Sequence, residues 1–312
     1  MSKYTPLHFI TVLALTPFFL FAQTANTQPV VELSNTFPQP QERIQATVRN
    51  TSSSAPGNLT WRIDNQVNAA HTNQRTIQFT AGALGTTIPI QVFQGERMIA
   101  EATVRPTYVD IIVEPQTYVP SFYEGRPLPS AGSQVRLTAL VDDGRGTDFS
   151  QYTYTWRFDN QLIAGGAARG ASQITTSVPN RRSVIVSVEV SRVGVGVVAR
   201  NSITVPIVEP QTIFYSVSAL HGLQPQALTN NTRMSGNVKT IRALPFYFPL
   251  QSLNQNAAIT WRVNGQERAA NTDTPFELTL RRDNTPQANV RFTLQNRGDI
   301  IYNTSSAIDI LY

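Results

Sequence analysis

The chain has 312 residues, of which 41% are apolar and 14% are charged, and its formal net charge is +5. This length is sufficient for two or three domains that each bury a core of their own. The positive charge comes from arginines scattered along the chain, since Lys3 and Lys239 are the only lysines. Scattered charge argues against nucleic-acid binding and leaves a generic polyanionic surface as an open alternative. No cysteine is present, so no disulfide can support a small domain.

The N-terminus has the features of a secretory signal peptide. Lys3 precedes an apolar run over residues 7–22, and FAQTA closes it, which predicts cleavage after Ala22 or Ala25. The run of about 16 residues contains Pro17 and is short for a membrane span, so an uncleaved anchor is the alternative. Without a cysteine after the run, a lipoprotein anchor is excluded. We therefore expect a mature protein that is secreted, periplasmic or at the cell surface.

One motif occurs three times and holds every tryptophan of the chain. LTWRIDNQ at 59–66 recurs as YTWRFDNQ at 154–161 and as ITWRVNGQ at 259–266. Apolar and polar residues alternate in each copy, which predicts a strand with one buried face. The DN, DN and NG that follow favour turns with positive φ. Trp61, Trp156 and Trp261 are thus predicted to be core residues.

Other strands accompany each copy at a nearly constant distance. A second alternating segment begins 27, 28 and 29 residues after the tryptophan, at Ile88, Val184 and Val290. Further strands are expected upstream, from Arg43, Gln134 and Val238. No helical periodicity is sustained over three turns, so the pattern indicates an all-β chain of three repeats.

The repeats predict a signal peptide at 1–22 and domains at 23–112, 113–207 and 208–312. IIVEPQTY at 111–118 and PIVEPQTI at 206–213 resemble each other, and each is expected to connect two domains. Proline restricts the backbone there, which favours a stiff rod of about 100–120 Å over flexible beads.

Aromatic residues follow both of these segments. We expect their rings to close the domain interfaces, and an exposed surface for carbohydrate or peptide is the alternative. The residues concerned are Tyr118, Phe122, Tyr123, Phe214 and Tyr215.

A tryptophan on a central strand, followed by a valine-rich strand, resembles the immunoglobulin-like plan. The resemblance is closest to bacterial immunoglobulin-like and polycystic-kidney-disease-type domains, whose Y-x-W-x-F pattern fits TYTWRFDN at 153–160. It covers all three repeats and implies three tandem immunoglobulin-like β-sandwiches after the signal peptide. A tyrosine corner is missing, which leaves the subtype open.

Two further segments resemble a narrower group. EPQTYVPSFYEGRPLPSAG at 114–132, with ALPFYFP at 243–249, is similar to uncharacterised exported immunoglobulin-like proteins of reduced-genome bacteria. This resemblance implies a cell-surface context and no particular chemistry.

Residues for catalysis are sparse. Outside the signal segment the histidines are His71 and His221, in different repeats, so neither a nucleophile–base pair nor a zinc site is expected. The best metal candidate is a weak calcium site in VDDGRGTD at 141–148, formed by Asp142, Asp143 and Asp148, with a simple polar turn as the favoured alternative. Arg181-Arg182 and Arg281-Arg282 are interpreted as solvated loop charges, with a sugar or polyanion contact as the alternative.

These patterns predict an exported, non-enzymatic protein that needs no cofactor. The expected role is adhesion or structural support of a surface assembly such as a pilus, through protein or glycan partners at the cell surface. The alternatives are a carbohydrate-binding accessory protein and, last, a hydrolase that depends on His221. We expect no nucleic-acid partner, and membrane contact only if the N-terminal segment stays uncleaved.

Overall fold

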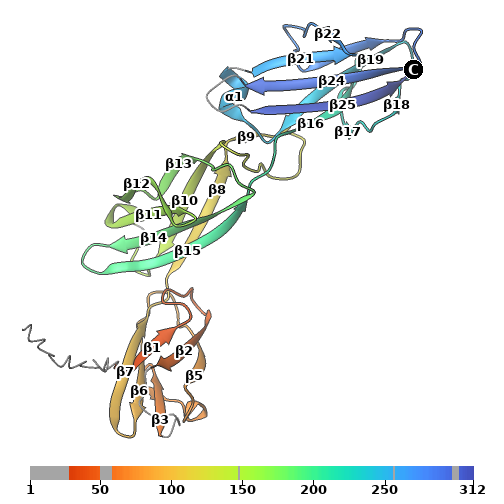
Figure 1. Cartoon of the computed structure of the whole chain (residues 1–312). Helices are drawn as coiled ribbons and strands as arrows, with labels where there is room; N and C mark the ends of the chain where they lie inside the picture. Colours follow the sequence, from red (N-terminus) through yellow and green to blue (C-terminus); the bar gives the residue numbers. More distant parts are fainter. Residues whose placement is uncertain (1–27, 50–57, 147, 256, 297–301) are drawn as a thin grey trace, which may run out of the picture. The chain divides into compact units, whose positions relative to one another are not determined.

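The computed structural model of the chain describes residues 28–49, 58–146, 148–255, 257–296 and 302–312 (Figure 1). The predicted signal segment lies outside these residues, so its cleavage stays a prediction. The described residues fall into two compact units. The first lies within Met1–Glu32, Ala46–Ile77 and Ile90–Ala102, and the second within Leu33–Gln45, Gln78–Pro89 and Thr103–Tyr312.

The fold is all-β and consists of three tandem immunoglobulin-like β-sandwiches. The first has sheets with the strand orders β1-β2-β5 and β4-β3-β6-β7. In β3, Leu59 and Trp61 are buried and Arg62 is exposed, because successive side chains of a strand point to opposite faces. Its elements are β1 (Val30–Leu33), β2 (Arg43–Arg49), β3 (Leu59–Ile63), β4 (Gln66–Val67), the 3-10 helix η1 (Ala69–His71), β5 (Thr76–Thr80), β6 (Ile88–Gln94) and β7 (Arg97–Val104).

The second sandwich packs a three-stranded sheet, β13-β10-β8, against a four-stranded sheet, β12-β11-β14-β15 (Figure 1). Trp156 of β11 lies opposite Val188 of β14, and both belong to one buried core. β14 is hydrogen-bonded to β11 on one side and to β15 on the other. The elements are β8 (Tyr108–Pro115), β9 (Thr117–Tyr118), β10 (Gln134–Asp142), η2 (Phe149–Gln151), β11 (Tyr152–Phe158), β12 (Gln161–Arg169), β13 (Gln173–Ser177), β14 (Ser183–Arg192) and β15 (Gly196–Pro206).

The third sandwich has the sheets β17-β16-β19-β23 and β18-β25-β24-β21-β22. Trp261 lies opposite Phe292, and their ring centroids are 4.8 Å apart. Helix α1 has fewer than two turns, which is too short to leave a periodic signal in the sequence. The elements are β16 (Gln211–Ser218), β17 (Gly222–Ala227), β18 (Thr232–Arg233), β19 (Val238–Phe246), β20 (Phe248–Pro249), α1 (Leu250–Gln255), β21 (Ala257–Val263), β22 (Gln266–Arg268), β23 (Glu277–Arg281), β24 (Gln287–Asn296) and β25 (Asn303–Leu311).

The turn after each tryptophan strand is a two-residue hairpin loop. Both loop residues have positive φ, at 50° and 62° in the first copy, 45° and 70° in the second, and 51° and 81° in the third. This is the conformation of a type I′ turn, which asparagine, aspartate and glycine favour. The prediction of positive φ is confirmed at Asp64-Asn65, Asp159-Asn160 and Asn264-Gly265.

Strand β8 differs from the sequence prediction. The segment 111–118 was expected to connect the first two domains, but β8 pairs with β10 along its whole length, from Tyr108 opposite Asp142 to Pro115 opposite Val135. Val109 and Ile111 are buried in the core of the second sandwich, which makes this segment its first strand. An extended strand of this length carries the chain to the far end of the sandwich. Residues 116–132 therefore meet the third sandwich.

Candidate interaction sites

The three indoles are buried and make the same polar contact. Trp61, Trp156 and Trp261 are at most 1% exposed. Each indole Nε1 donates to a main-chain carbonyl farther along its own repeat: to Gln74 at 2.8 Å, to Ala171 at 3.0 Å and to Pro275 at 3.0 Å. A buried indole N–H needs such a partner. With ring and N–H both occupied, these tryptophans have no surface to offer a ligand.

Main-chain hydrogen bonds join the second sandwich to the third. β9 pairs antiparallel with β20, so that Tyr118 lies opposite Phe248. The Tyr247 amide donates to the Tyr118 carbonyl at 2.7 Å, and the Leu250 amide donates to the Gln116 carbonyl at 3.0 Å. Two-stranded pairing fixes register and direction as well as proximity. Residues 116–118 thus contact the third sandwich as well as the second.

Aromatic rings pack around these bonds in what we call the aromatic joint. Phe122 meets Tyr215 edge to face, with centroids 5.2 Å apart, and Tyr123 meets Phe246 in the same way at 5.4 Å. Such a pair contributes about 0.5–1.5 kcal/mol beyond the area it buries. The aromatic joint consists of Tyr118, Phe122, Tyr123, Tyr215, Phe246 and Tyr247.

The five predicted interface rings therefore separate into two groups. Tyr118, Phe122 and Tyr123 were expected to close a domain interface, and they lie in the aromatic joint between the second and third sandwiches, because β8 carries the chain past the second sandwich. Tyr215 meets them there and is only 5% exposed. Phe214 points the other way, since neighbours on a strand alternate, and its centroid lies 6.2 Å from that of Trp261 in the third core. These rings pack on one another and do not form an open aromatic platform.

Tyr247 is held in an unusual conformation at the centre of the aromatic joint. Its φ of +59° lies in the left-handed region, which a bulky side chain rarely adopts. Its amide is bonded to Tyr118, and its hydroxyl lies 2.9 Å from the Tyr123 hydroxyl. Burial, followed by the bond to Tyr123, raises the pKa of Tyr247 to about 12. Contacts at both ends of the residue hold the strained backbone in place.

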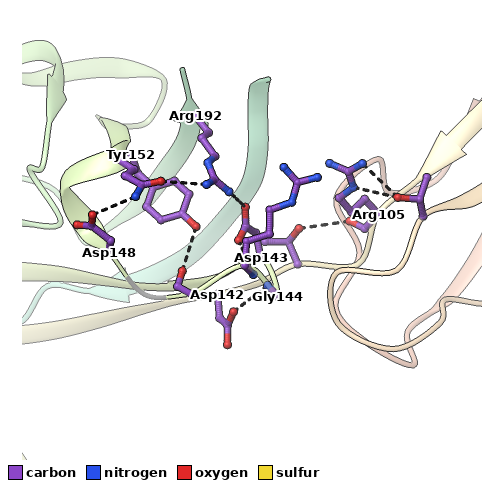
Figure 2. A network of polar contacts seen from close by, with 12 residues as sticks. Arg105, Asp142, Asp143, Gly144, Asp148, Tyr152 and Arg192 are labelled. Carbon is purple, nitrogen blue, oxygen red and sulfur yellow. Dashed lines mark hydrogen bonds and ion pairs between the residues drawn. The ribbon is translucent and has the colours of Figure 1, made fainter. Parts of the chain in front are cut away.

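Asp142, Asp143 and Asp148 of the acidic segment accept hydrogen bonds from residues close to them in the chain (Figure 2). Asp142 Oδ1 accepts from the Gly144 amide at 2.8 Å, and Asp143 Oδ1 accepts from the Arg145 amide at 3.0 Å. Asp148 Oδ1 accepts from both the amide and the hydroxyl of Ser150, which lowers the pKa of Asp148. These bonds are typical of aspartates that stabilise turns.

Asp143 also takes part in a buried ion pair. Its side chain is 4% exposed, and its Oδ2 lies 3.2 Å from Arg192 Nη1. Arg192 Nη2 donates to Gln151 Oε1 at 2.9 Å, and its guanidinium lies 6.0 Å from the centroid of the Tyr152 ring. Burial, and then the hydrogen bond with Asp143, raises the pKa of Tyr152 to about 12. Figure 2 shows Arg192 between Tyr152 and Asp143.

The remaining candidates for metal binding or catalysis are the acidic side chains and the two histidines. Among the described residues, no group of three or more His, Asp or Glu side chains could hold a metal ion. His221 lies exposed at a turn where its amide donates to Ser218 Oγ, and His71 belongs to the other compact unit. Within the part of the chain that the structure describes, no helix has the length and apolar character to cross a membrane.

Two residue pairs that are central to these sites could not be predicted from the sequence. Arg192 and Asp143 are 49 residues apart, and Tyr123 and Tyr247 are 124 residues apart. No local pattern marks either pair. The aromatic and proline content of the segments ALPFYFP and 114–132 is the one signal of the aromatic joint in the sequence.

Taken together, the sheets, the buried indoles and the aromatic joint define a protein of tandem immunoglobulin-like sandwiches. No protein-family model and no curated protein matches the sequence. Solved structures match at low similarity. The three N-terminal domains of the bacteriophage RB49 Highly Immunogenic Outer Capsid protein (Hoc) are 14% identical, with 91% of this chain and 98% of that chain covered and a TM-score of 0.26.

Two further matches are of the same order. The mouse nectin-like molecule 4 ectodomain (Ig1–Ig3) is 12% identical, covering 88% of this chain and 95% of that one, with a TM-score of 0.25. SGBP-B of Bacteroides ovatus, in complex with a mixed-linkage heptasaccharide, is 15% identical, covering 92% and 71%, with a TM-score of 0.24. These similarities extend no further than the fold.

Proposed function

We propose that this is an exported, non-enzymatic protein of the cell envelope or surface, in which immunoglobulin-like sandwiches set a fixed spacing for adhesion or for a larger surface assembly such as a pilus. The aromatic joint is the observation that carries this proposal. A flexible tether needs no backbone pairing between its domains, whereas this joint combines the β9–β20 pairing with interlocked rings. Ordering a linker costs conformational entropy, and these contacts offset that cost.

The experiment measures the distance between the second and third sandwiches. The chain has no cysteine, so Leu162→Cys and Leu220→Cys provide unique label sites, and both positions are well exposed, at 59% and 83%. Electron–electron resonance between spin labels is expected to give one narrow distance distribution. Replacing Tyr123 and Tyr215 by alanine should broaden it, while the exposed Tyr108→Ala should not. A broad distribution in the parent protein would contradict a fixed spacing.

The location and the lack of enzymatic activity need separate tests. Antibody against the second sandwich is expected to label intact cells, or cells in which only the outer membrane is opened, as strongly as fully permeabilised cells. The purified protein is expected to leave model esters, peptides and glycosides unchanged. Turnover that disappears in His221→Ala would support the hydrolase alternative instead.

Carbohydrate binding is the second candidate function. The observation that favours it is a polar groove on the outer face of the second sandwich, where Arg157, whose side chain has no partner among the described residues, lies among hydroxyl and amide side chains.

A further inference from the structure

The outer face of the four-stranded sheet of the second sandwich carries a groove of about 580 Å³. Trp156, Val186 and Val188 point inward to the core, so the residues between them point outward. Arg157 of β11 lies opposite Ser187 of β14, which lies opposite Ser202 of β15. The polar and charged residues of this sheet that line what we call the Arg157 groove include Arg157, Asn160, Ser187, Glu189, Arg200 and Ser202, and Asn35 of the segment between β1 and β2 lines it as well.

The Arg157 side chain has no partner among the described residues. Its guanidinium makes no hydrogen bond, ion pair or ring contact there, although the side chain is half-buried. The neighbouring acid, Glu189, is already engaged, because its Oε2 lies 2.7 Å from the guanidinium of Arg200. Asp159 is engaged outside the groove, with Arg181 at 2.6 Å. The two arginines and one glutamate of the groove therefore leave one positive charge unmatched.

The three repeats provide an internal comparison for this arginine. Each has an arginine directly after its buried tryptophan. In the first repeat, Arg62 stacks over the Phe93 ring, 4.3 Å from its centroid. In the third, Arg262 lies 3.8 Å from Glu267. Both of these are exposed, whereas the partnerless Arg157 is half-buried in a groove. With no ion pair or ring contact among the described residues, the Arg157 guanidinium is available to an external anion.

The surroundings of Arg157 restrict the kind of ligand. The main-chain groups of β14 are paired with β11 on one side and β15 on the other, so a peptide strand cannot be added on this face. Recognition must use side chains. The hydroxyls of Ser187 and Ser202 and the amide of Asn160 both donate and accept, which suits a ligand rich in hydroxyl groups. The guanidinium offers a fork of N–H donors that matches a carboxylate.

We propose that the Arg157 groove binds an acidic saccharide, with the sugar carboxylate on Arg157 and the ring hydroxyls on the serine and asparagine side chains. This inference does not depend on the fixed spacing proposed above. Loss of sugar binding would leave the label distances unchanged, and a broad distance distribution would leave sugar binding unaffected.

Titration calorimetry on the full chain with tetragalacturonate tests the proposal. Arg157→Gln is expected to weaken binding about tenfold to a hundredfold, the range for one charge-assisted contact. Arg62→Gln and Arg262→Gln are the matched controls, since they remove the same side chain from the same strand position, and they should bind like the parent. Arg157→Lys keeps the charge and loses the fork, so an intermediate affinity is expected.

Two other ligands test whether binding requires both the saccharide and its negative charge. The neutral methyl ester of the same tetrasaccharide and polyglutamate are both expected to bind at least tenfold more weakly. The proposal is overturned if tetragalacturonate gives no heat at millimolar concentration, if polyglutamate binds equally well, or if the three glutamine variants lose affinity alike. Circular dichroism of each variant checks that the sandwich is folded. If Arg157→Gln does not fold, Arg157→Lys still tests the contact.

Discussion

Tyr154 gives the sharpest test of how the second sandwich is held together. The residue is fully buried in β11, packed in the same core as Trp156. Its hydroxyl has no hydrogen-bond partner among the described residues. A buried hydroxyl without a partner costs about 1–3 kcal/mol of desolvation. Tyr154→Phe removes that oxygen, keeps the ring, and is expected to stabilise the sandwich by about 1–2 kcal/mol at neutral pH.

The same substitution should change the response to alkali. Burial raises the pKa of Tyr154 to about 12, while the unfolded chain keeps the ordinary value near 10. Below pH 10 both states hold the proton, so stability does not depend on this group. Between about pH 10 and 12 the unfolded state releases it first, and stability falls by about 1.4 kcal/mol per pH unit. Tyr152, also near 12, adds a similar slope, so Tyr154→Phe should remove about half of the slope from the two tyrosines.

Urea unfolding followed by tryptophan fluorescence measures both effects. Because one tryptophan belongs to each repeat, a variant in which Trp61 and Trp261 are replaced by phenylalanine reports on the second sandwich through Trp156 alone. The comparison is made at pH 7, 10 and 11.5 with and without Tyr154→Phe. A loss of stability greater than about 1 kcal/mol at pH 7 would show that the hydroxyl has a partner and refute the reasoning.

Three further results are expected. Trp156→Ala should lower the stability of the second sandwich by about 3–5 kcal/mol, and calorimetry should show the other transitions preserved, since an equal loss in all of them would contradict separate cores. Arg192→Met leaves the buried Asp143 carboxylate without its cation and should cost about 2–4 kcal/mol in urea unfolding, whereas the exposed Arg181→Met should cost at most about 1 kcal/mol. Calcium should give no heat and no melting shift, because Asp142, Asp143 and Asp148 already accept hydrogen bonds from neighbouring amides and Asp143 also pairs with Arg192; a rise in melting temperature would restore the metal site.

Strands could be predicted from the sequence because their cause is local. Alternation in LTWRIDNQ and its two copies reflects which face is buried, and DN or NG sets the turn that follows. The course of the chain between sandwiches could not be predicted in this way. IIVEPQTY looks like a connector, yet its first half pairs with β10 and its second half with β20. The pairing with β20 depends on residues more than a hundred positions away in the sequence, and no local pattern indicates them.

The aromatic joint shows the same division between local and distant causes. Proline and aromatic content marked the segments 114–132 and 243–249 as unusual. Which ring meets which could not be derived, because Tyr123 and Tyr247 are brought together only by the folding of both sandwiches. The left-handed φ of Tyr247 has no signal in the sequence either, since tyrosine rarely adopts it.

The arginine after each tryptophan shows how the three repeats share a fold and differ at the surface. Its position after the tryptophan is fixed by the strand, so in all three repeats it emerges on the outer face. The core of each of the three repeats requires the same indole, and its N–H makes the same kind of hydrogen bond in all of them. The outer face has no such requirement, and the three arginines differ. Arg62 stacks on Phe93, Arg262 pairs with Glu267, and the Arg157 side chain has neither kind of partner within the part of the chain that the structure describes. Features that all three repeats share reflect the requirements of folding. A binding site specific to one sandwich must lie where they disagree, and the groove around Arg157 is such a place.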